Sequence, residues 1–393
     1  MDNLQKIIKI ILNNQIRKLQ YEIPSKKRDW YKELDINSNR GILVSGPRGT
    51  GKTSWLLINL VDSNCLYFSA DSPIVSGVSL YNLCEQIFLS GYDGVFIDEV
   101  HYAKDWSLHA KALYDAFPNK KIVICDSSSV ALRKGIGDIS RRFINLSMPM
   151  LSFREYLMLK YNINIQKFNP YKLSDIKIDF IIENKLNIIK DFNDYLAYGT
   201  RPFFLESTTN YQDKLLNIIQ KTIESDIPCL LPQINMNHLG FMNSVIGFLA
   251  NSKNPTINIE RQTSLWSIGK EKLYNLLNAM EKVHLIRIIK KQNDFKMYSK
   301  GEKIFLFDPT VYNLFNGNIG TLREAYTAAA SIDSGHQFYA LKNETVCDFI
   351  LDNYKIEVGG RNKTIKNADY VIRDNLDVAY ENVIPLWMLG FEY

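Results

Sequence analysis

Short apolar runs alternate with segments of helical periodicity through the first third of the chain. Residues 1–20 carry apolar side chains at helical spacing, which predicts an amphipathic helix. The apolar runs that follow predict strands, and the stretches between them predict helices. The expected strands are 41–45, 65–70, 94–97 and 121–125, and the expected helices are 52–60, 80–89 and 106–117. Strands separated by helices imply an α/β fold with a parallel, doubly wound sheet.

The pattern changes after residue 150. Residues 151–231 lose the strand signals and read as helical, whereas 238–315 predict helices followed by a hairpin. The hairpin is expected from a helix at 269–283, a strand at 285–290 and a returning strand at 295–298, which is the order of a winged-helix module. A helix near 322–330 and several short strands predict a small α/β domain at the end. The expected parts are therefore 1–150, 151–235, 236–315 and 316–393.

Composition narrows the class of protein. With 46% hydrophobic and 23% charged residues, the chain is typical of a soluble globular protein. The net charge of +5 permits contact with nucleic acid without requiring it. The five cysteines are scattered singly, which favours reduced thiols over a disulfide framework or a zinc site. Neither a signal peptide nor a membrane span is indicated, so a cytoplasmic protein is expected.

A glycine-rich turn joins the first predicted strand to the helix at 52–60. It matches G-x-x-x-x-G-K-[ST] in full, a loop whose backbone N–H groups and helix N-terminus bind phosphates. Lys52 is expected to reach the β- and γ-phosphates, and the Thr53 hydroxyl to coordinate Mg²⁺. The residues expected to bind ATP are Gly46, Pro47, Arg48, Gly49, Thr50, Gly51, Lys52, Thr53 and Ser54.

The third predicted strand ends in two acids, Asp98 and Glu99. An acid at this position lies beside the metal, so Asp98 is a candidate ligand of Mg²⁺ together with Thr53. The next acid can orient and deprotonate a water, which makes Glu99 the candidate general base. A module that only binds nucleotide does not need Glu99, so its presence favours hydrolysis of ATP.

Further candidates follow the fourth strand. Ser127 stands at the strand tip, where a polar side chain can sense the γ-phosphate, although a plain serine turn explains it too. Arg141 and Arg142 could supply a guanidinium to the γ-phosphate of a neighbouring copy in a homo-oligomer. A solvated surface pair is the alternative for these two arginines.

Basic and aromatic residues mix in the predicted wing, where Lys290, Lys291 and Lys303 lie near Phe295 and Tyr298. Such a mixture suits contact with the phosphate backbone of double-stranded DNA. The predicted recognition helix carries Lys270 and Lys272 near its start. A charged hairpin surface or a site for protein partners remains the alternative.

Several motifs together resemble one group of prokaryotic ATPases of the AAA+ superfamily. Beyond the glycine-rich loop and Asp98-Glu99, the resemblance rests on Leu151-Ser-Phe-Arg-Glu-Tyr-Leu157, Gly199-Thr-Arg-Pro202 and Ile384-Pro-Leu-Trp-Met-Leu-Gly-Phe-Glu-Tyr393. It implies an ATPase core at 1–150, a helical lid at 151–235, a winged-helix module at 236–315 and a C-terminal domain at 316–393. Asp126 departs from the family, which usually has glycine in a Thr-Gly-Ser tip.

The resemblance also implies that the C-terminal domain is similar to the PD-(D/E)XK nuclease fold. By position, Glu324 would be the helix acid, Asp348 the strand acid and Glu357 the partner acid. Glycine occupies position 359, where such nucleases carry lysine, and Lys363 is a candidate substitute. The domain is expected to be a retained fold that serves as a scaffold or a binding surface, with an active nuclease as the alternative.

The sequence thus predicts an ATPase that binds ATP and ADP with Mg²⁺. Its nucleotide state would be coupled to DNA contact through the winged helix. A nucleotide-gated switch acting on protein partners and an ATPase-gated nuclease are the alternatives.

Overall fold

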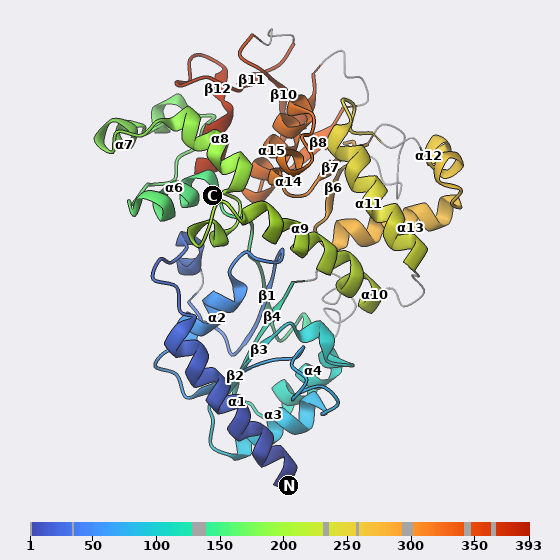
Figure 1. Ribbon diagram of the computed structural model, residues 1–393. Coiled ribbons are helices and arrows are strands. Elements are labelled where there is room, and N and C mark those ends of the chain that lie inside the picture. Colours follow the sequence, from blue (N-terminus) through green and yellow to red (C-terminus); the bar gives the residue numbers. More distant parts are fainter. Residues whose placement is uncertain are drawn as a thin grey trace. The chain divides into compact units, whose positions relative to one another are not determined.

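The computed structural model describes residues 2–33, 35–127, 139–230, 236–256, 259–292, 302–341, 347–362 and 367–393 (Figure 1). The chain forms two compact units, Met1–Met150 and Leu151–Tyr393. Among the described residues, the first unit has one sheet and the second unit has two. No helix in the described ranges is both long and apolar enough to cross a lipid bilayer.

A five-stranded parallel sheet forms the centre of the first unit, with the strand order β2-β3-β4-β1-β5. Its strands are β1 (Gly41–Ser45), β2 (Cys65–Ser69), β3 (Gly94–Asp98), β4 (Lys121–Asp126) and β5 (Ile144–Ser147). Strand β4 lies between β3 and β1, and the three strands are parallel. Their carboxyl ends therefore lie side by side at one edge of the sheet. Polar residues that follow these strands are therefore brought together.

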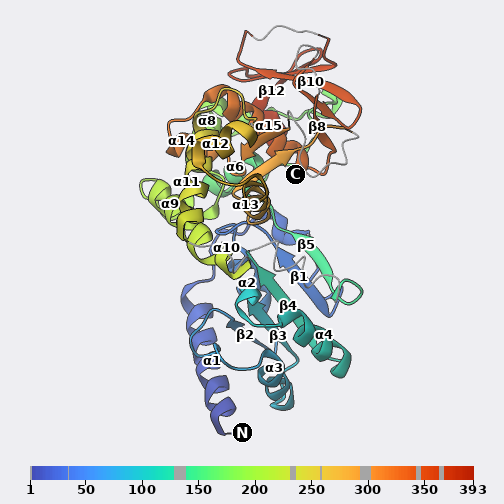
Figure 2. The ribbon, with the colours of Figure 1, turned by 90° about the vertical axis from the view of Figure 1, so that its right-hand side faces the viewer.

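Helices cover both faces of this sheet (Figures 1 and 2). They are α1 (Asp2–Tyr21), α2 (Lys52–Leu60), α3 (Leu80–Leu89) and α4 (Trp106–Ala116). Successive residues of β1 enter two different cores: Leu43 packs with α3 and α4, whereas Ile42 and Val44 pack with α2. This alternation is the reason that the strands read as continuous apolar runs. The predicted α/β fold is confirmed.

Strand β5 was not expected from the sequence. It pairs in parallel with β1 from Ile42↔Ile144 to Ser45↔Ser147, and it is an edge strand whose side chains are largely exposed. The sequence Ile-Asn-Leu-Ser has neither a continuous apolar run nor a buried face, so it carries no strand signal.

The second unit begins with helices. They are α6 (Phe153–Tyr161), α7 (Asp179–Glu183), α8 (Ile188–Tyr198), α9 (Tyr211–Lys221), α10 (Ile227–Leu230), α11 (Met236–Asn251), α12 (Ile259–Trp266) and α13 (Lys270–Lys282), with a π-helical turn at Thr222–Asp226. A two-stranded antiparallel sheet follows, made of β6 (Ile286–Ile289) and β7 (Lys303–Leu306). The strand that returns is therefore β7. The strand expected at 295–298 falls outside the described residues.

The last sheet of the second unit has the order β12-β11-β10-β9-β8. Its strands are β8 (Phe338–Ala340), β9 (Phe349–Leu351), β10 (Tyr354–Gly359), β11 (Tyr370–Arg373) and β12 (Val383–Pro385), preceded by α14 (Thr310–Leu314) and α15 (Ile319–Asp333). The final 3₁₀ turn, Leu386–Phe391, packs on α6 through the rings of Phe153, Trp387 and Phe391. Segments far apart in the sequence thus share one aromatic core.

The Gly-Thr-Arg-Pro motif has a structural role in this unit. Arg201, which is 4% exposed, forms an ion pair with Asp308, and the Thr200 hydroxyl donates to the same carboxylate at 3.0 Å. The motif therefore joins the end of α8 to the segment after β7 through buried charges. A buried pair of this kind is costly to break, because the remaining charge keeps no partner.

Candidate active site

The loop at residues 46–51 runs from the end of β1 to the start of α2. Gly46, Gly49 and Gly51 have φ angles of 155°, 76° and 97°, which side chains disfavour. At Gly46 a Cβ atom would also lie 2.2 Å from the carbonyl oxygen of Met148. The loop can follow this path only with glycine at Gly46. It ends at Lys52, where the N-terminal N–H groups of α2 begin.

Lys52 is almost fully buried, with 5% of its surface exposed. Its Nζ donates to the carbonyl oxygens of Gly46 and Pro47 at 2.7 and 2.8 Å, so the ammonium lies inside the curve of the loop. Burial lowers the pKa of Lys52, while the nearby charge of Glu99 acts in the opposite direction. A buried cation surrounded by loop backbone is suited to an anionic ligand.

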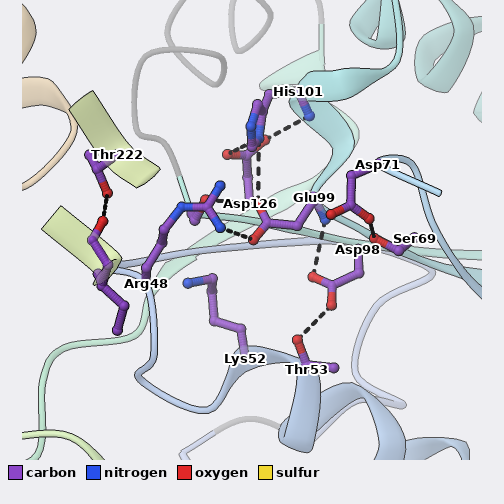
Figure 3. A network of polar contacts seen from close by, with 12 residues as sticks. Arg48, Lys52, Thr53, Ser69, Asp71, Asp98, Glu99, His101, Asp126 and Thr222 are labelled. Atoms are coloured by element: carbon purple, nitrogen blue, oxygen red, sulfur yellow. Dashed lines mark hydrogen bonds and ion pairs between the residues drawn. The ribbon is translucent and has the colours of Figure 1, made fainter. Parts of the chain in front are cut away.

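Thr53 and Asp98 meet at the end of β3 (Figure 3). The Thr53 hydroxyl donates to Asp98 Oδ2 at 2.6 Å, and the Tyr67 hydroxyl donates to the same oxygen at 3.3 Å. Asp98 is 4% exposed. Burial, together with the charge of Glu99, raises the pKa of Asp98 to about 6. Hydroxyl and carboxylate oxygens are the donors that Mg²⁺ prefers, so this pair fits a magnesium site.

Glu99 stands just after β3 with a φ of 48°, a left-handed conformation that is uncommon outside glycine. Arg48 donates to its Oε1 at 3.2 Å, and the Ser127 hydroxyl donates to its Oε2 at 2.7 Å (Figure 3). Burial alone would raise the pKa of Glu99, but the charges of Arg48, Lys52 and His101 hold it below its ordinary value. Glu99 is therefore held as a carboxylate.

His101 and Asp126 add a second layer that sequence reasoning did not assign. Asp126 is fully buried and accepts from the backbone N–H of His101 at 3.0 Å. The Nδ1 of His101 lies 3.1 Å from Asp126 Oδ1 and 3.5 Å from Glu99 Oε2. One imidazole nitrogen is thus shared by two carboxylates. Asp126 faces His101, whereas Ser127, the candidate sensor, contacts Glu99.

Residues 28–31, which precede β1, bind the backbone of the loop. The sequence did not reveal these contacts. Arg28 is 2% exposed and donates to the carbonyl oxygens of Thr50, Pro149 and Met150 at 2.8, 2.9 and 3.3 Å. The Tyr31 hydroxyl donates to the Gly51 carbonyl at 2.9 Å. Trp30 meets Trp55 of α2 edge to face, with ring centroids 6.4 Å apart. These hydrogen bonds hold the carbonyl groups of Thr50 and Gly51 towards this segment and so fix the course of the loop.

Three further residues predicted for the nucleotide site are Ser54, Arg141 and Arg142. Ser54 is half-buried in the first turn of α2. Arg142 forms a bidentate ion pair with Asp115 of α4, at 2.7 Å for each bond, and Arg141 is exposed. The role of either arginine towards a second copy of the chain stays a prediction.

In the second unit, the structure brings two of the nuclease-like acids together. Asp348 precedes β9 and its N–H donates to Ile356, so it lies opposite Glu357 of β10. Glu357 is 0% exposed, and Asp348 accepts from the N–H of Val358 at 2.9 Å. Glu324 of α15 instead pairs with Lys303 at 2.8 Å. Lys363 lies outside the described residues.

Lys303 was expected to contact DNA, but its side chain is buried. Its side chain is 4% exposed, pairs with Glu324 and lies 4.4 Å from the ring centre of Phe349. It therefore joins the hairpin to the last domain. Lys270 and Lys272, in contrast, are exposed at the start of α13.

A family model matches most of the first unit. Residues 38–157 match the model of the family described as an AAA domain. The chain is 27% identical over 314 residues to the uncharacterized protein MJ1637 of Methanocaldococcus jannaschii, an overlap of 74% of this chain and 63% of that protein. The chain thus spans less than two thirds of the length of this relative.

The comparison with solved structures found matches of low identity and low TM-score. The Walker-type ATPase PABY2304 of Pyrococcus abyssi has 13% identity and a TM-score of 0.41, over 75% of this chain and 96% of that one. DnaA of Aquifex aeolicus bound to AMPPCP has 14% identity and a TM-score of 0.27, over 64% and 86%. The match over residues 38–157 indicates an AAA domain in the first unit, and the loop, Lys52 and Asp98-Glu99 form its candidate nucleotide site.

Proposed function

We propose that this protein binds ATP with Mg²⁺ at the loop 46–53 and hydrolyses it. The observation that carries the proposal is the meeting of three elements at one sheet edge. Lys52 inside the loop, the Thr53–Asp98 hydrogen bond and the doubly held Glu99 all lie where β1, β3 and β4 end. A triphosphate, a divalent cation and an activated water need these groups in this neighbourhood.

Each residue has a distinct part in the proposed reaction. The loop N–H groups and the Lys52 ammonium bind the phosphates and neutralise their charge. Thr53 and Asp98 hold Mg²⁺, which when bound withdraws charge from the phosphate oxygens. Glu99, kept as a carboxylate, accepts a proton from the attacking water. His101 and Ser127 fix the direction of that carboxylate.

An ATPase assay with two variants tests the proposal. Lys52→Ala is expected to abolish nucleotide binding, whereas Glu99→Gln is expected to bind ATP and to lower kcat by about 10²-fold or more. Lys9→Ala, at an exposed position of α1, is the matched control and should hydrolyse ATP at the wild-type rate. Wild-type turnover in both site variants would refute the assignment.

We also propose that nucleotide state controls contact with double-stranded DNA through α13. The supporting observation is the exposure of Lys270 and Lys272 near its start, because the start of a recognition helix is the part that enters the major groove. The double variant Lys270→Gln, Lys272→Gln should weaken duplex binding and reduce the salt slope by about 2. Duplex DNA should raise ATPase turnover in the wild type only. Unchanged turnover would favour a switch that acts on protein partners.

A further inference from the structure

Arg48 occupies an unusual place in the loop. Its side chain is 12% exposed and forms an ion pair with Glu99 Oε1 at 3.2 Å, while Ser127 binds the other oxygen of the same carboxylate. Figure 3 shows the Arg48 side chain extending from the loop to Glu99. Both oxygens of the candidate base are therefore engaged by protein donors. A carboxylate held on both oxygens has reduced capacity to orient a water.

The guanidinium group allows Arg48 to exchange Glu99 for another anion. The guanidinium is planar, always charged and weakly hydrated, and it binds phosphate oxygens in a bidentate manner. A γ-phosphate offers more negative charge and more acceptor oxygens than the single Glu99 carboxylate. ADP has no such group. The terminal phosphate of ATP is thus a stronger partner for Arg48 than Glu99 is.

We propose that Arg48 moves between two partners, Glu99 and the γ-phosphate of ATP, and so acts as a catalytic residue supplied within the chain. This inference rests on the proposed ATPase function. Without a γ-phosphate, Arg48 restrains Glu99. With ATP, Arg48 binds the γ-phosphate and frees Glu99 Oε1 to bind water. The water oxygen then bonds to the γ-phosphorus, the bond to the β–γ bridging oxygen breaks, and the water proton passes to Glu99.

After hydrolysis the inorganic phosphate leaves and Arg48 returns to Glu99. The same side chain therefore stabilises the charge that develops on the γ-phosphate and restrains the base when only ADP is bound. It also gives the site a means to distinguish ATP from ADP, which the loop N–H groups alone do not provide.

Nucleotide affinity in a Glu99→Gln background is the test, because this background separates binding from hydrolysis. Fluorescent N-methylanthraniloyl ATP and ADP are titrated with Mg²⁺ against Glu99→Gln alone and with Arg48→Gln, Arg48→Lys or Arg17→Gln added. Arg17 is an exposed arginine of α1 and serves as the matched control. Arg48→Gln should reduce the preference for ATP over ADP by about tenfold or more. Arg48→Lys should restore part of it, and Arg17→Gln should leave it unchanged.

Two results overturn the inference. If Arg48→Gln lowers the affinities for ATP and ADP equally, or changes neither, Arg48 does not bind the γ-phosphate. In the Glu99-containing protein, Arg48→Gln should lower kcat by about 10²-fold, and a kcat that is unchanged or raised contradicts the exchange. Failure of the Glu99→Gln protein itself to bind either nucleotide would refute the proposed function, whereas binding without an effect of Arg48 would refute only this inference.

Discussion

The shared imidazole of His101 shows how single residues shape the candidate site. Its Nδ1 lies between Asp126 and Glu99, and its side chain is 1% exposed. Asp126 also accepts from the backbone of His101, so it fixes both the ring and the turn that follows Glu99. Since Asp126 contacts both the ring and the backbone of His101, we expect it to affect catalysis through His101.

Replacing Asp126 with asparagine tests this route. The amide keeps the size of the side chain but loses the charge that orients the imidazole, so Glu99 should be held less well. We expect kcat to fall by about tenfold with KM nearly unchanged. Steady-state ATPase kinetics measure both constants. Asp93→Asn, at an exposed carboxylate of the same unit, is the control, and an unaltered kcat in Asp126→Asn would remove His101 from the mechanism.

The sequence reveals the residues of a motif better than it reveals the residues that contact them in the folded chain. Lys52, Thr53, Asp98 and Glu99 could be named because their types and spacings follow from phosphate chemistry and from the strands around them. Arg28 could not be named, and His101 could be placed near the site from its position after Glu99 but not given its partners. Arg28 contacts a carbonyl 121 residues away, and His101 contacts a carboxylate 25 residues away. Such contacts arise only when the fold is complete.

Elements of the first unit were predicted closely because their signal is local. Buried parallel strands are apolar throughout, and glycine-rich or polar turns mark their ends. Strand β5 was missed because its side chains are largely exposed. Strand β7 was not predicted because Lys303 looks like a surface residue, although its side chain is buried and pairs with Glu324. The ion pair between Lys303 and Glu324 forms only in the folded chain, and it allows a lysine to lie in a buried strand.

The segment before β1 is an element whose loss should weaken the loop. Arg28→Ala leaves three carbonyl oxygens without their donor, two of which belong to the end of the first unit. We expect a loss of about 2–4 kcal/mol in unfolding free energy and a lower affinity for ATP. Chemical denaturation and nucleotide titration measure these effects. Lys27→Ala, at an exposed neighbouring position, is expected to change neither, and wild-type behaviour of Arg28→Ala would contradict the role.

A charged cluster ties β8 and β9 to the end of the second unit. His336 Nδ1 lies 2.7 Å from Asp352, and its Nε2 lies 3.0 Å from Glu392. Burial lowers the pKa of His336, but hydrogen bonds to Glu392 and Asp352 outweigh it and raise that pKa above 6.5. The folded state therefore holds the proton more tightly than the unfolded state. The stabilisation is complete below pH 6.5 and is lost as the pH rises through the raised pKa.

Thermal unfolding at several pH values tests this cluster. Between pH 6 and 8.5 the Tm of the wild type should fall by more than that of His336→Gln, because only the wild type releases this proton. His109→Gln is the matched control, since His109 is a histidine of the first unit with no part in the cluster. Parallel Tm curves for the wild type and His336→Gln would show that His336 contributes no pH dependence.

At the scale of the whole molecule, the nucleotide site lies within one unit. Every side chain of the proposed reaction precedes Leu151, where the second unit begins. Ligand binding stabilises the part that forms the site, by about 2.7 kcal/mol at a ligand concentration of a hundred times Kd. The predicted lid at 151–235 and the predicted winged-helix module at 236–315 belong to the second unit, and we expect them to respond to nucleotide.

Hydrogen exchange can separate the two units. With saturating ATP and Mg²⁺, the Glu99→Gln protein should show strong protection in β1, β3 and the loop, and smaller changes in β9 and β10. Mass spectrometry of peptides from each unit measures this difference. Lys52→Ala with the same ligand is the control and should show no added protection. Equal protection throughout the chain would mean that the two units unfold as one.

The contact between Trp30 and Trp55 gives the protein an optical reporter of its own. One indole lies on the segment that binds the loop carbonyls, and the other lies in α2 directly after the loop. Any rearrangement of the loop changes the distance or tilt between the two rings, and therefore the emission of the protein. The chain has five tryptophans. With phenylalanine at Trp106, Trp266 and Trp387, this pair would be the only tryptophans, and selective excitation of indole would follow the loop in real time without a label.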